Sequence, residues 1–374
     1  SIRAYRKLMA AETAAHAPAA TGPSISKHRT MSDETGQNRV ARSGRVKTGV
    51  ALCALAGIAL AIVLVVYFGT AEVGDAFLAA GWQGLAAMTG LYLASVTLCA
   101  FAWQVLAVTL PGNAVAVFHW ARLLRDSVAN ILAIIPGAGE AIAARELTVS
   151  GMKSGAAIAS TVIDVTMEIV SQLFFTLLGL GFLAWIRPGE PLAWWALAGL
   201  AISAVAMAGF VAAPRSGLFQ FLQSLPDKLG LTAPWSADDQ SQNIHAAMED
   251  IYQQPSRPII STILHLVAWI VGAAEAWIAL KFMGHPLGFG EILVIESLVF
   301  ALRTIAFIVP WAAGVQEGGY IAIGAMFGLT PEVALGLSLL KRARELLTGV
   351  PVLLVWQAIE ARRLLRSPRN VEGR

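Results

Sequence analysis

The sequence has too little charge for a soluble protein of its length. Only 14% of its 374 residues are Asp, Glu, Lys or Arg, whereas 56% are hydrophobic and the mean hydropathy is +0.65. Soluble domains carry about 25% charged residues, and an apolar run of about 18 residues is long enough to cross a bilayer. The deficit therefore indicates a membrane protein, and a net charge of +3 offers no electrostatic footprint for nucleic acid.

Cysteine pairs and catalytic motifs are also lacking. Cys53 and Cys99 lie inside apolar runs and form no CxxC, which argues against a disulfide framework, a zinc finger and a thioredoxin-type centre. The six histidines show no metal-ligand spacing, and no G-x-S-x-G, H-E-x-x-H or Walker sequence is present. We therefore expect no cofactor, no metal and no enzyme activity. His265, alone in an apolar run, is interpreted as a packed core residue.

Polar, basic tails flank one long apolar region. Residues 1–46 are predicted to be a disordered cytoplasmic tail, because their composition cannot bury enough apolar surface to fold, and residues 361–374 form a second basic tail. One interpretation of residues 1–30 is a translated upstream extension, since Met31 opens a natural-looking start. Residues 47–360 are predicted to form one transmembrane domain with a cytoplasmic loop at 214–257.

Several apolar runs are long enough to cross the ~30 Å hydrocarbon core of a bilayer. Two other runs are interrupted by proline and glycine, which free backbone groups that need partners inside the protein, so these runs are predicted to be re-entrant hairpins. The predicted fold is an all-α integral membrane protein with six full spans and two hairpins, or alternatively eight spans. The predicted spans are 48–68, 84–110, 155–186, 191–213, 258–282 and 331–359, and the hairpins pair 120–135 with 140–150 and 291–309 with 315–328.

The distribution of Lys and Arg predicts the orientation. Both tails and the flanks of the central loop are basic, so they are expected on the cytoplasmic side of a bacterial inner membrane. The loop after the first span contains Glu72 and Asp75 and is expected outside, whereas Lys281 is a mild violation. Within the central loop, 236–253 is predicted to be a polar helix with its few apolar residues facing inward.

Part of the first half recurs in the second half, 177 residues further along the chain. With the predicted topology, the first hairpin opens to the cytoplasm and the second to the outside, which is the arrangement of an inverted repeat with a substrate site near the midplane. Coincidence is the alternative, because the two stretches otherwise share little identity. The repeated positions are Glu140, Gly151 and Glu168, which recur as Glu317, Gly328 and Glu345, while Asp164 falls opposite Lys341.

Charged residues inside the apolar runs mark a candidate site. Asp164 and Glu168 share one helix face, and Lys341, Arg344 and Glu345 share a face of the last span. An ionised side chain at the bilayer centre costs about 2.5–3.5 kcal/mol, so these groups must pair or line a wet cavity. One interpretation is a polar route for a charged group. The other is a structural cross-link, with Lys341 paired to Glu345 or to Asp164.

Two glutamates follow the hairpin breaks directly. At such helix starts, free N–H groups attract an anion such as a lipid phosphate, although each glutamate could instead cap its own helix. Arginines on the first hairpin arms are expected to complete the lining, because arginine suits bidentate phosphate contacts. The predicted binding or translocation residues are Glu140, Glu317, Arg125, Arg303, Asp164, Glu168, Lys341, Arg344 and Glu345.

These strings resemble a known family. Val-Gln-Glu-Gly-Gly at 315–319 and Leu-Lys-Arg-Ala-Arg-Glu at 340–345 are similar to the lysylphosphatidylglycerol synthase transmembrane, or flippase-like, family, and most similar to its hopanoid-biosynthesis-associated, HpnL-type branch. In the multiple peptide resistance factor, a domain of this kind is assigned to lipid flipping ahead of a soluble aminoacyl-transferase domain. The resemblance implies lipid movement. It implies no synthase activity, because the chain shows no aminoacylating domain.

Two functions follow from these observations. The first is translocation of a polar or hopanoid-type membrane lipid, driven by a gradient or by none, since no ATP motif is present. The second is a non-catalytic membrane partner of hopanoid-pathway enzymes, which would dock on the cytoplasmic loop. A membrane-embedded enzyme that uses the carboxylates as acid and base ranks third, because no reaction signature accompanies them.

Overall fold

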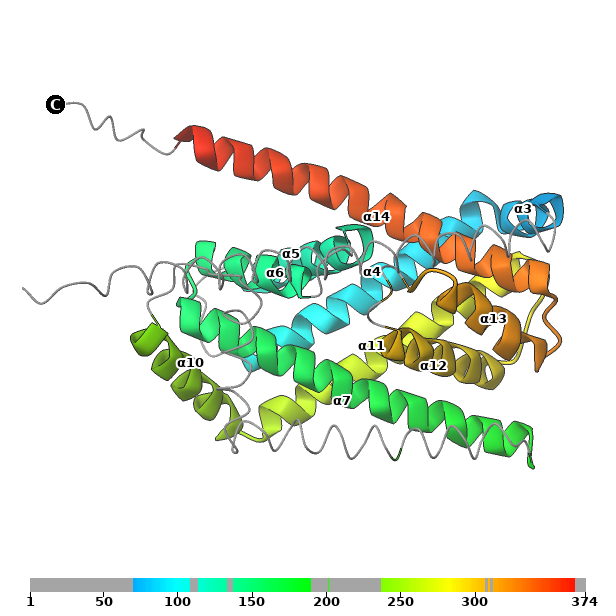
Figure 1. The fold of residues 1–374 in the computed structure, drawn as a ribbon, viewed down its shortest axis with the longest axis horizontal. Helices are drawn as coiled ribbons and strands as arrows, with labels where there is room; N and C mark the ends of the chain where they lie inside the picture. The colour runs from blue at the N-terminus through cyan, green and yellow to red at the C-terminus, as the bar shows by residue number, and fades with distance from the viewer. Residues whose placement is uncertain are drawn as a thin grey trace, which may run out of the picture. The chain divides into compact units, whose positions relative to one another are not determined.

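The chain is built from helices (Figure 1). The computed structural model describes residues 70–107, 114–132, 137–189, 237–306 and 312–366, with residues 201 and 309, and this part of the chain contains no strand. The all-α fold class is therefore confirmed. The predicted spans 48–68 and 191–213, Cys53, both tails and most of the central loop lie outside the described residues.

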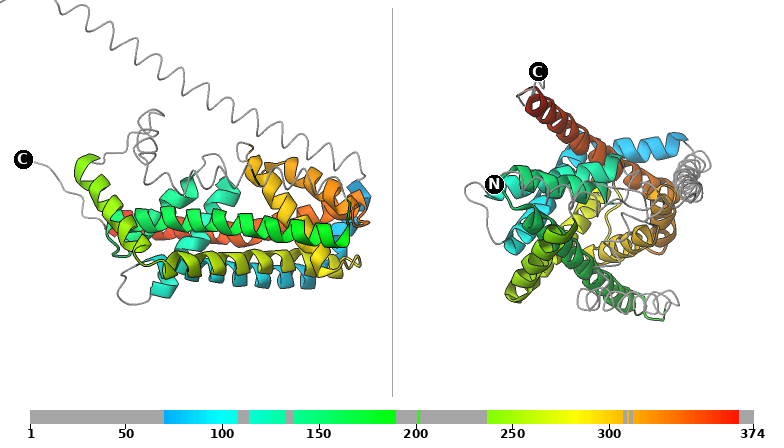
Figure 2. Two further views of the ribbon diagram at one scale, coloured as in Figure 1. Left: turned by 90° about the horizontal axis from the view of Figure 1, so that it is seen from below. Right: turned by 60° about the vertical axis from the view of Figure 1, so that its left-hand side comes forward.

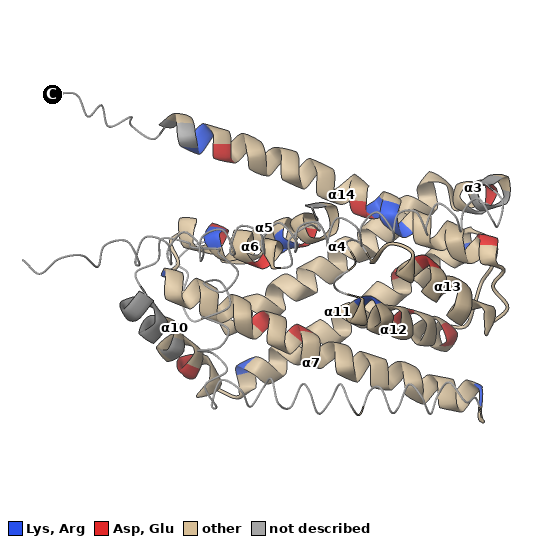
Figure 3. Cartoon of the chain, viewed as in Figure 1, with Lys and Arg blue, Asp and Glu red and all other residues tan. Residues whose placement is uncertain are grey.

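Three of the described helices are long and apolar enough to cross a membrane. They are α4 (Gly81–Leu106), α7 (Ser154–Ile186) and α11 (Ser256–Phe282), and they begin and end within a few residues of three predicted spans. A fourth long helix, α14 (Pro331–Arg366), contains 36 residues. Besides Glu332 in its first turn, charged residues occur in two groups along α14, one at mid-helix and one near its C-terminal end, so it is less apolar than the other three (Figure 3).

Two broken segments pack beside the long helices. The first comprises α5 (Ala114–Ser127), a π-helical turn (Val128–Leu132) and α6 (Ala138–Val149), and the second comprises α12 (Phe289–Ile305) and α13 (Val315–Ala325). Both predicted hairpin breaks are present. The first arms are shifted relative to the predicted bounds, since α5 begins before residue 120 and α12 ends before residue 309. The hairpins lie near different ends of α7 (Figures 1 and 2).

The helix starts reproduce the 177-residue offset of the sequence repeat. Helices α6 and α13 begin at residues 138 and 315, and α7 and α14 begin at residues 154 and 331. The glycines before α6 and α13, Gly137 and Gly314, have φ angles of 83° and 76°, which other residues rarely adopt. Helices α7 and α14 run in opposite directions (Figures 1 and 2). These correspondences support an inverted repeat.

A short helix occupies a stretch that was expected to be a loop. Helix α3 (Thr70–Ala79) contains both acidic residues of the predicted outer loop and packs against α14. Because Phe77 of α3 packs against the main hydrophobic core, the stretch gains apolar burial by folding as a helix. The expectation of a loop here is wrong.

The polar helix predicted in the central loop is present as α10 (Ala237–Tyr252). Its apolar side packs on α7, where Met248 and Ile251 are buried beside Ile163 and Met167. The inward orientation predicted for the apolar residues of this helix is therefore confirmed. The same packing means that α10 belongs to the helix bundle and does not hang free of it.

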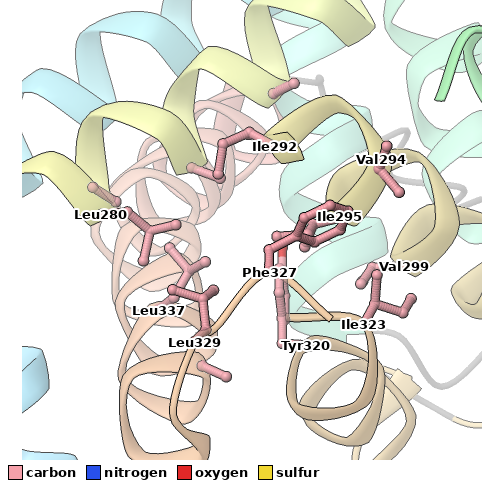
Figure 4. Close-up of a cluster of buried hydrophobic side chains, with 14 of the residues drawn as sticks. Leu280, Ile292, Val294, Ile295, Val299, Tyr320, Ile323, Phe327, Leu329 and Leu337 are labelled. Carbon is pink, nitrogen blue, oxygen red and sulfur yellow. The ribbon is translucent and has the colours of Figure 1, made fainter. Parts of the chain in front are cut away.

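The main hydrophobic core joins the second hairpin to the long helices. Leu280 of α11, Ile292 and Ile295 of α12, Ile323 of α13 and Leu337 of α14 meet there and are nearly inaccessible (Figure 4). Elsewhere α4 and α11 approach closely through small side chains, and the Ser95 hydroxyl donates a hydrogen bond of 3.0 Å to the Ala268 carbonyl. Small residues of this kind allow helices to pack tightly within a membrane.

Two glycines of α7 provide a matched test of this packing. A methyl group at Gly179 would overlap the Ser297 hydroxyl of α12 and would lie 3.1 Å from the Leu293 carbonyl oxygen, whereas a methyl group at Gly181 meets nothing within 4 Å. Gly179→Ala should therefore lower stability by about 1–3 kcal/mol through overpacking. Gly181→Ala should be neutral or raise stability by about 0.5–1 kcal/mol. Thermal unfolding in one detergent checks both, and equal effects would contradict the α7–α12 packing.

Candidate functional site

One arginine ties the first hairpin to the long helix α7. The Arg125 guanidinium donates to Glu140 Oε1 at 3.2 Å, to Asp164 Oδ2 at 3.1 Å and to Glu168 Oε2 at 2.8 Å. Its three acceptors come from α6 and α7, whereas Arg125 itself is on α5. The Arg125 side chain is 8% exposed and that of Asp164 is 0% exposed, so these charges are removed from solvent and depend on one another.

A second arginine, Arg122, lies one turn earlier on α5 and bonds to the Glu168 carboxylate. Arg122 Nη1 and Nη2 donate to the two oxygens of Glu168 at 3.1 and 2.7 Å, and Arg122 Nε donates to Asp126. A bidentate pair of this geometry is among the strongest charge-assisted contacts in proteins. Glu168 therefore accepts hydrogen bonds from two buried guanidinium groups at once.

A histidine of α11 completes this cluster. His265 Nε2 lies 2.9 Å from Asp164 Oδ1, and both side chains are 0% exposed. The prediction that His265 is a packed core residue is confirmed, and its imidazole also bonds to a carboxylate. We call this cluster the first-half network; its members are Arg122, Arg125, Asp126, Glu140, Asp164, Glu168 and His265.

The second hairpin is held by a lysine. Lys341 Nζ of α14 lies 2.6 Å from Glu296 Oε2 of α12, and the Tyr320 hydroxyl of α13 donates to the other oxygen of Glu296 at 2.7 Å. The expected pairing of Lys341 with Glu345 or Asp164 is wrong. Glu296 faces Lys341 from a neighbouring helix and is 0% exposed, so it needs the lysine charge more than the half-buried Glu345 does.

Glu317 caps its own helix and also pairs with an arginine. The Gly314 N–H donates to Glu317 Oε2 at 2.7 Å, while Arg342 Nε and the Ser338 hydroxyl donate to Oε1 at 2.8 and 3.2 Å. The capping interpretation is therefore confirmed for Glu317. Glu140 instead bonds to Arg125, and no described contact joins Glu140 to Glu317. The two glutamates belong to different clusters.

A third buried pair connects α11 to α14. Arg344 donates to both oxygens of Glu275 at 2.8 and 3.2 Å, and its guanidinium lies 4.1 Å from the ring centroid of Tyr92 on α4. Arg344 was predicted as a site residue, whereas its partner Glu275 was not. Both side chains are less than a tenth exposed.

Two predicted site residues remain without a counterion among the described residues. Arg303 is half-buried at the end of α12, where its guanidinium lies 5.5 Å from the Phe300 ring centroid. Glu345 is half-buried on α14, next to the Glu275–Arg344 pair. In the part of the chain that the structure describes, neither forms an ion pair.

The C-terminal part of α6 is tied to the end of α14. Arg363 donates to both oxygens of Glu146, and Arg145 donates to both oxygens of Glu360 at 3.1 and 2.8 Å. The indole of Trp356 also donates to Glu146, at 3.3 Å. Hydrogen bonds from Arg145 and Arg363 hold the pKa of the solvent-facing Glu360 carboxyl below its usual value. This contact fixes α6 against a helix from the other half of the repeat.

Sequence reasoning missed several members of these clusters. Glu275, Glu296 and His265 are isolated polar residues in apolar runs, and each forms a hydrogen bond or an ion pair with another helix. Because an ionised group inside a membrane is costly unless it is paired, each isolated residue was itself a signal of a partner. The partner's identity depends on how the helices pack, and the sequence does not show that.

These features define a class of protein: a polytopic α-helical membrane protein whose deeply buried charges are paired between helices. A family model described as the lysylphosphatidylglycerol synthase transmembrane region matches residues 54–352, and the chain belongs to this family. Comparisons with curated proteins and with solved structures give no match. The family expected from the sequence strings is thus confirmed.

The Glu275–Arg344 pair generates a stability prediction. Glu275→Ala or Arg344→Ala alone should each cost about 3–5 kcal/mol, because each leaves an uncompensated buried charge. Replacing both residues with leucine should restore most of the loss, since two apolar side chains leave no charge to solvate. Thermal unfolding of the purified variants measures this, with the exposed Glu249→Ala of α10 as the control. Single variants that unfold like Glu249→Ala would contradict the pairing.

Glu317 and Glu291 allow the cap to be separated from the ion pair. Each carboxylate accepts the backbone N–H of the glycine that precedes its helix, at 2.7 and 2.8 Å, but Glu291 is in an exposed capping contact. Glu291→Ala should cost about 0.5–2 kcal/mol as a lost cap. Glu317→Ala should cost more, because Arg342 loses a partner as well. Glu317→Gln should keep the cap and fall between the two, and equal losses for both alanine variants would exclude a contribution from the ion pair.

Proposed function

We propose that this protein moves polar membrane lipids across the bilayer and does not synthesise them. The observation that carries the proposal is that Arg303 on α12 and Glu345 on α14 are half-buried and form no ion pair among the described residues, in a fold with two oppositely directed halves. Opposed hairpins are typical of transporters whose substrates bind near the midplane. The family description, which names the membrane region of a phospholipid synthase, supports a lipid as the substrate.

Arg303 is the residue best suited to a lipid phosphate. Arg122 and Arg125 already bond to carboxylates, whereas the Arg303 guanidinium bonds to no described carboxylate and can donate two parallel hydrogen bonds. Glu345 would then accept from an amine or hydroxyl of the same headgroup. The acyl chains would remain in the surrounding lipid, against exposed apolar residues of α14 such as Leu346 and Leu354.

The hopanoid context is the finer part of the proposal. It rests on the resemblance to the hopanoid-associated branch. A polyol-bearing hopanoid presents hydroxyls that can donate hydrogen bonds to Glu345 and Glu140. The alternative is a non-catalytic partner of hopanoid-pathway enzymes in the inner membrane, with both termini cytoplasmic. Because the apolar side of α10 packs on α7, such an enzyme would dock on the polar side of α10, where Glu249 and Asp250 are exposed.

Reconstitution with labelled lipids tests the proposal. In proteoliposomes, Arg303→Gln and Glu345→Gln should each slow the appearance of labelled phosphatidylglycerol in the opposite leaflet by tenfold or more, with an unchanged unfolding temperature. Lys281→Gln, at an exposed end of α11, is the matched control for a lost charge. A parallel series with a labelled hopanoid polyol distinguishes the two lipid classes.

Two outcomes would count against translocation. Wild-type protein that moves neither lipid faster than protein-free vesicles would contradict the function, and variants as fast as the wild type would contradict the site. If the wild type is inactive but Glu249→Lys/Asp250→Lys removes the chain from a complex with another membrane enzyme, the partner role is favoured.

A further inference from the structure

We infer that His265 and Asp164 form a buried proton-binding site, and that the bound proton balances the charge of the first-half network. The site is described by its contacts and its charge, independently of any transported lipid. Its use in driving transport, by contrast, rests on the function proposed above.

The charge balance of the network is the first observation. Arg122 and Arg125 contribute two positive charges, while Asp126, Asp164 and Glu168 contribute three negative charges, and the exposed fraction of these five side chains is at most 17%. Glu140 is 31% exposed, so solvent can balance it at the rim. The buried part therefore lacks one positive charge. Protonated His265 supplies that charge, and an unbalanced charge at this depth would be costly.

The second half needs no such proton. Its buried carboxylates are each paired with a cation of α14, so these described ion pairs leave no charge over. Asp164 and Lys341 stand at equivalent positions of the repeat, so the second half has a fixed cation where the first half has an anion. These ion pairs are Glu296 with Lys341, Glu317 with Arg342 and Glu275 with Arg344.

The position of the imidazole is the second observation. Its Nε2 bonds to Asp164 at 2.9 Å, whereas its Nδ1 is buried without a hydrogen-bond partner. A carboxylate oxygen of Glu168 and the Cys99 sulfur lie within 4.8 Å of an imidazole nitrogen. Asp164 and Glu168 are one turn apart on α7, so the ring stands close to both carboxylates. A small shift would let Nδ1–H donate to Glu168.

The charged and titratable groups near this site lie on the neighbouring helices. The thiol of Cys99 on α4 is neutral when protonated, and α5 contributes its two arginines and one aspartate. The nearest fixed cations are already bonded to carboxylates, so they do not replace the imidazolium at Asp164 Oδ1. The groups around the ring are Cys99 on α4, Arg122, Arg125 and Asp126 on α5, Glu140 on α6, and Asp164 and Glu168 on α7.

A metal ion fits this donor set less well than a proton does. The atoms of Cys99, Glu168 and His265 lie close enough together for a metal site. However, Glu168 already accepts three hydrogen bonds from two guanidinium groups, so a divalent cation there would lie beside two fixed positive charges. A proton adds the single positive charge that the network lacks. Its binding does not require Glu168 to leave the two guanidinium groups.

Loss of the proton would loosen the first hairpin. The imidazolium would give the Nδ1 proton to water and become neutral, with its Nε2–H still bonded to Asp164. One negative charge would then be uncompensated inside the bundle. Arg125 lies on the first arm of the hairpin and bonds both to Asp164 and to Glu140 on the second arm, so its hydrogen bonds would change. A proton gradient can in this way favour either the tightly packed or the loosened state of the first hairpin. It would supply the driving force of a transporter without an ATP motif.

Solid-state NMR of histidine-labelled protein in lipid bilayers tests the site directly. At pH 7.5, about one unit above the ordinary histidine pKa of ~6.5, the wild type should show an imidazolium signal that His265→Gln removes. Asp164→Asn should convert that signal to neutral imidazole. His119→Gln is the matched control, because His119 is half-buried on α5 but faces Thr97 at 3.4 Å. A neutral His265 in the wild type at pH 7.5 would overturn the proposal.

A charge-replacement series gives a second readout if a variant folds poorly. His265→Lys should unfold at a higher temperature than His265→Gln at pH 7.5, because lysine restores the missing positive charge. The reverse order would show that the network needs a neutral group at this position. One equivalent of zinc retained by the purified wild type and lost in both His265→Gln and Cys99→Ser would also overturn the proposal. None of these measurements depends on lipid transport, so the site and the proposed function can fail separately.

Discussion

The structure depends on the pairing of charges that are removed from water. Arg125 illustrates the constraint, since one buried guanidinium holds carboxylates from α6 and α7 and so fixes how the first hairpin packs. Within a bundle of apolar helices the hydrophobic effect alone distinguishes one helix–helix contact poorly from another. Fixed ion pairs supply that specificity, because only one arrangement leaves no buried charge alone. Small residues then set how closely the chosen partners approach.

The two halves solve this constraint differently. Beside the first hairpin, two arginines and His265 of α11 face a group of carboxylates, whereas beside the second hairpin a lysine on the long helix faces a single glutamate. The exchange of Asp164 for Lys341 at equivalent positions reverses the sign of the charge at the centre of each half. With the proton site inferred above, the first-half network gains and loses a charge, whereas the second half pairs Lys341 with Glu296. That asymmetry suits a protein that alternates between two states.

The fold class, three spans, both hairpin breaks and the family followed from the sequence, because each depends on local features such as apolar length, proline, glycine and short strings. The pairing of charges did not follow. Lys341 bonds to Glu296 and Arg344 to Glu275 because helices far apart in the sequence meet in space. Helix α3 was missed for the same reason, since its burial depends on α14. Of the predicted site residues, Arg125, Glu140, Asp164 and Glu168 lie in one cluster, whereas Glu317, Lys341 and Arg344 pair with other residues.

The central claim is that a lipid headgroup contacts the unpaired charges beside the second hairpin. Photocrosslinking with a phospholipid that carries its reactive group on the headgroup tests it most directly. The account predicts adducts on the C-terminal turn of α12 and on α14 around Arg303 and Glu345, which an excess of unlabelled lipid should suppress. Adducts confined to exposed aromatic positions such as Trp82 and Trp185, with none on α12 or α14, would contradict it.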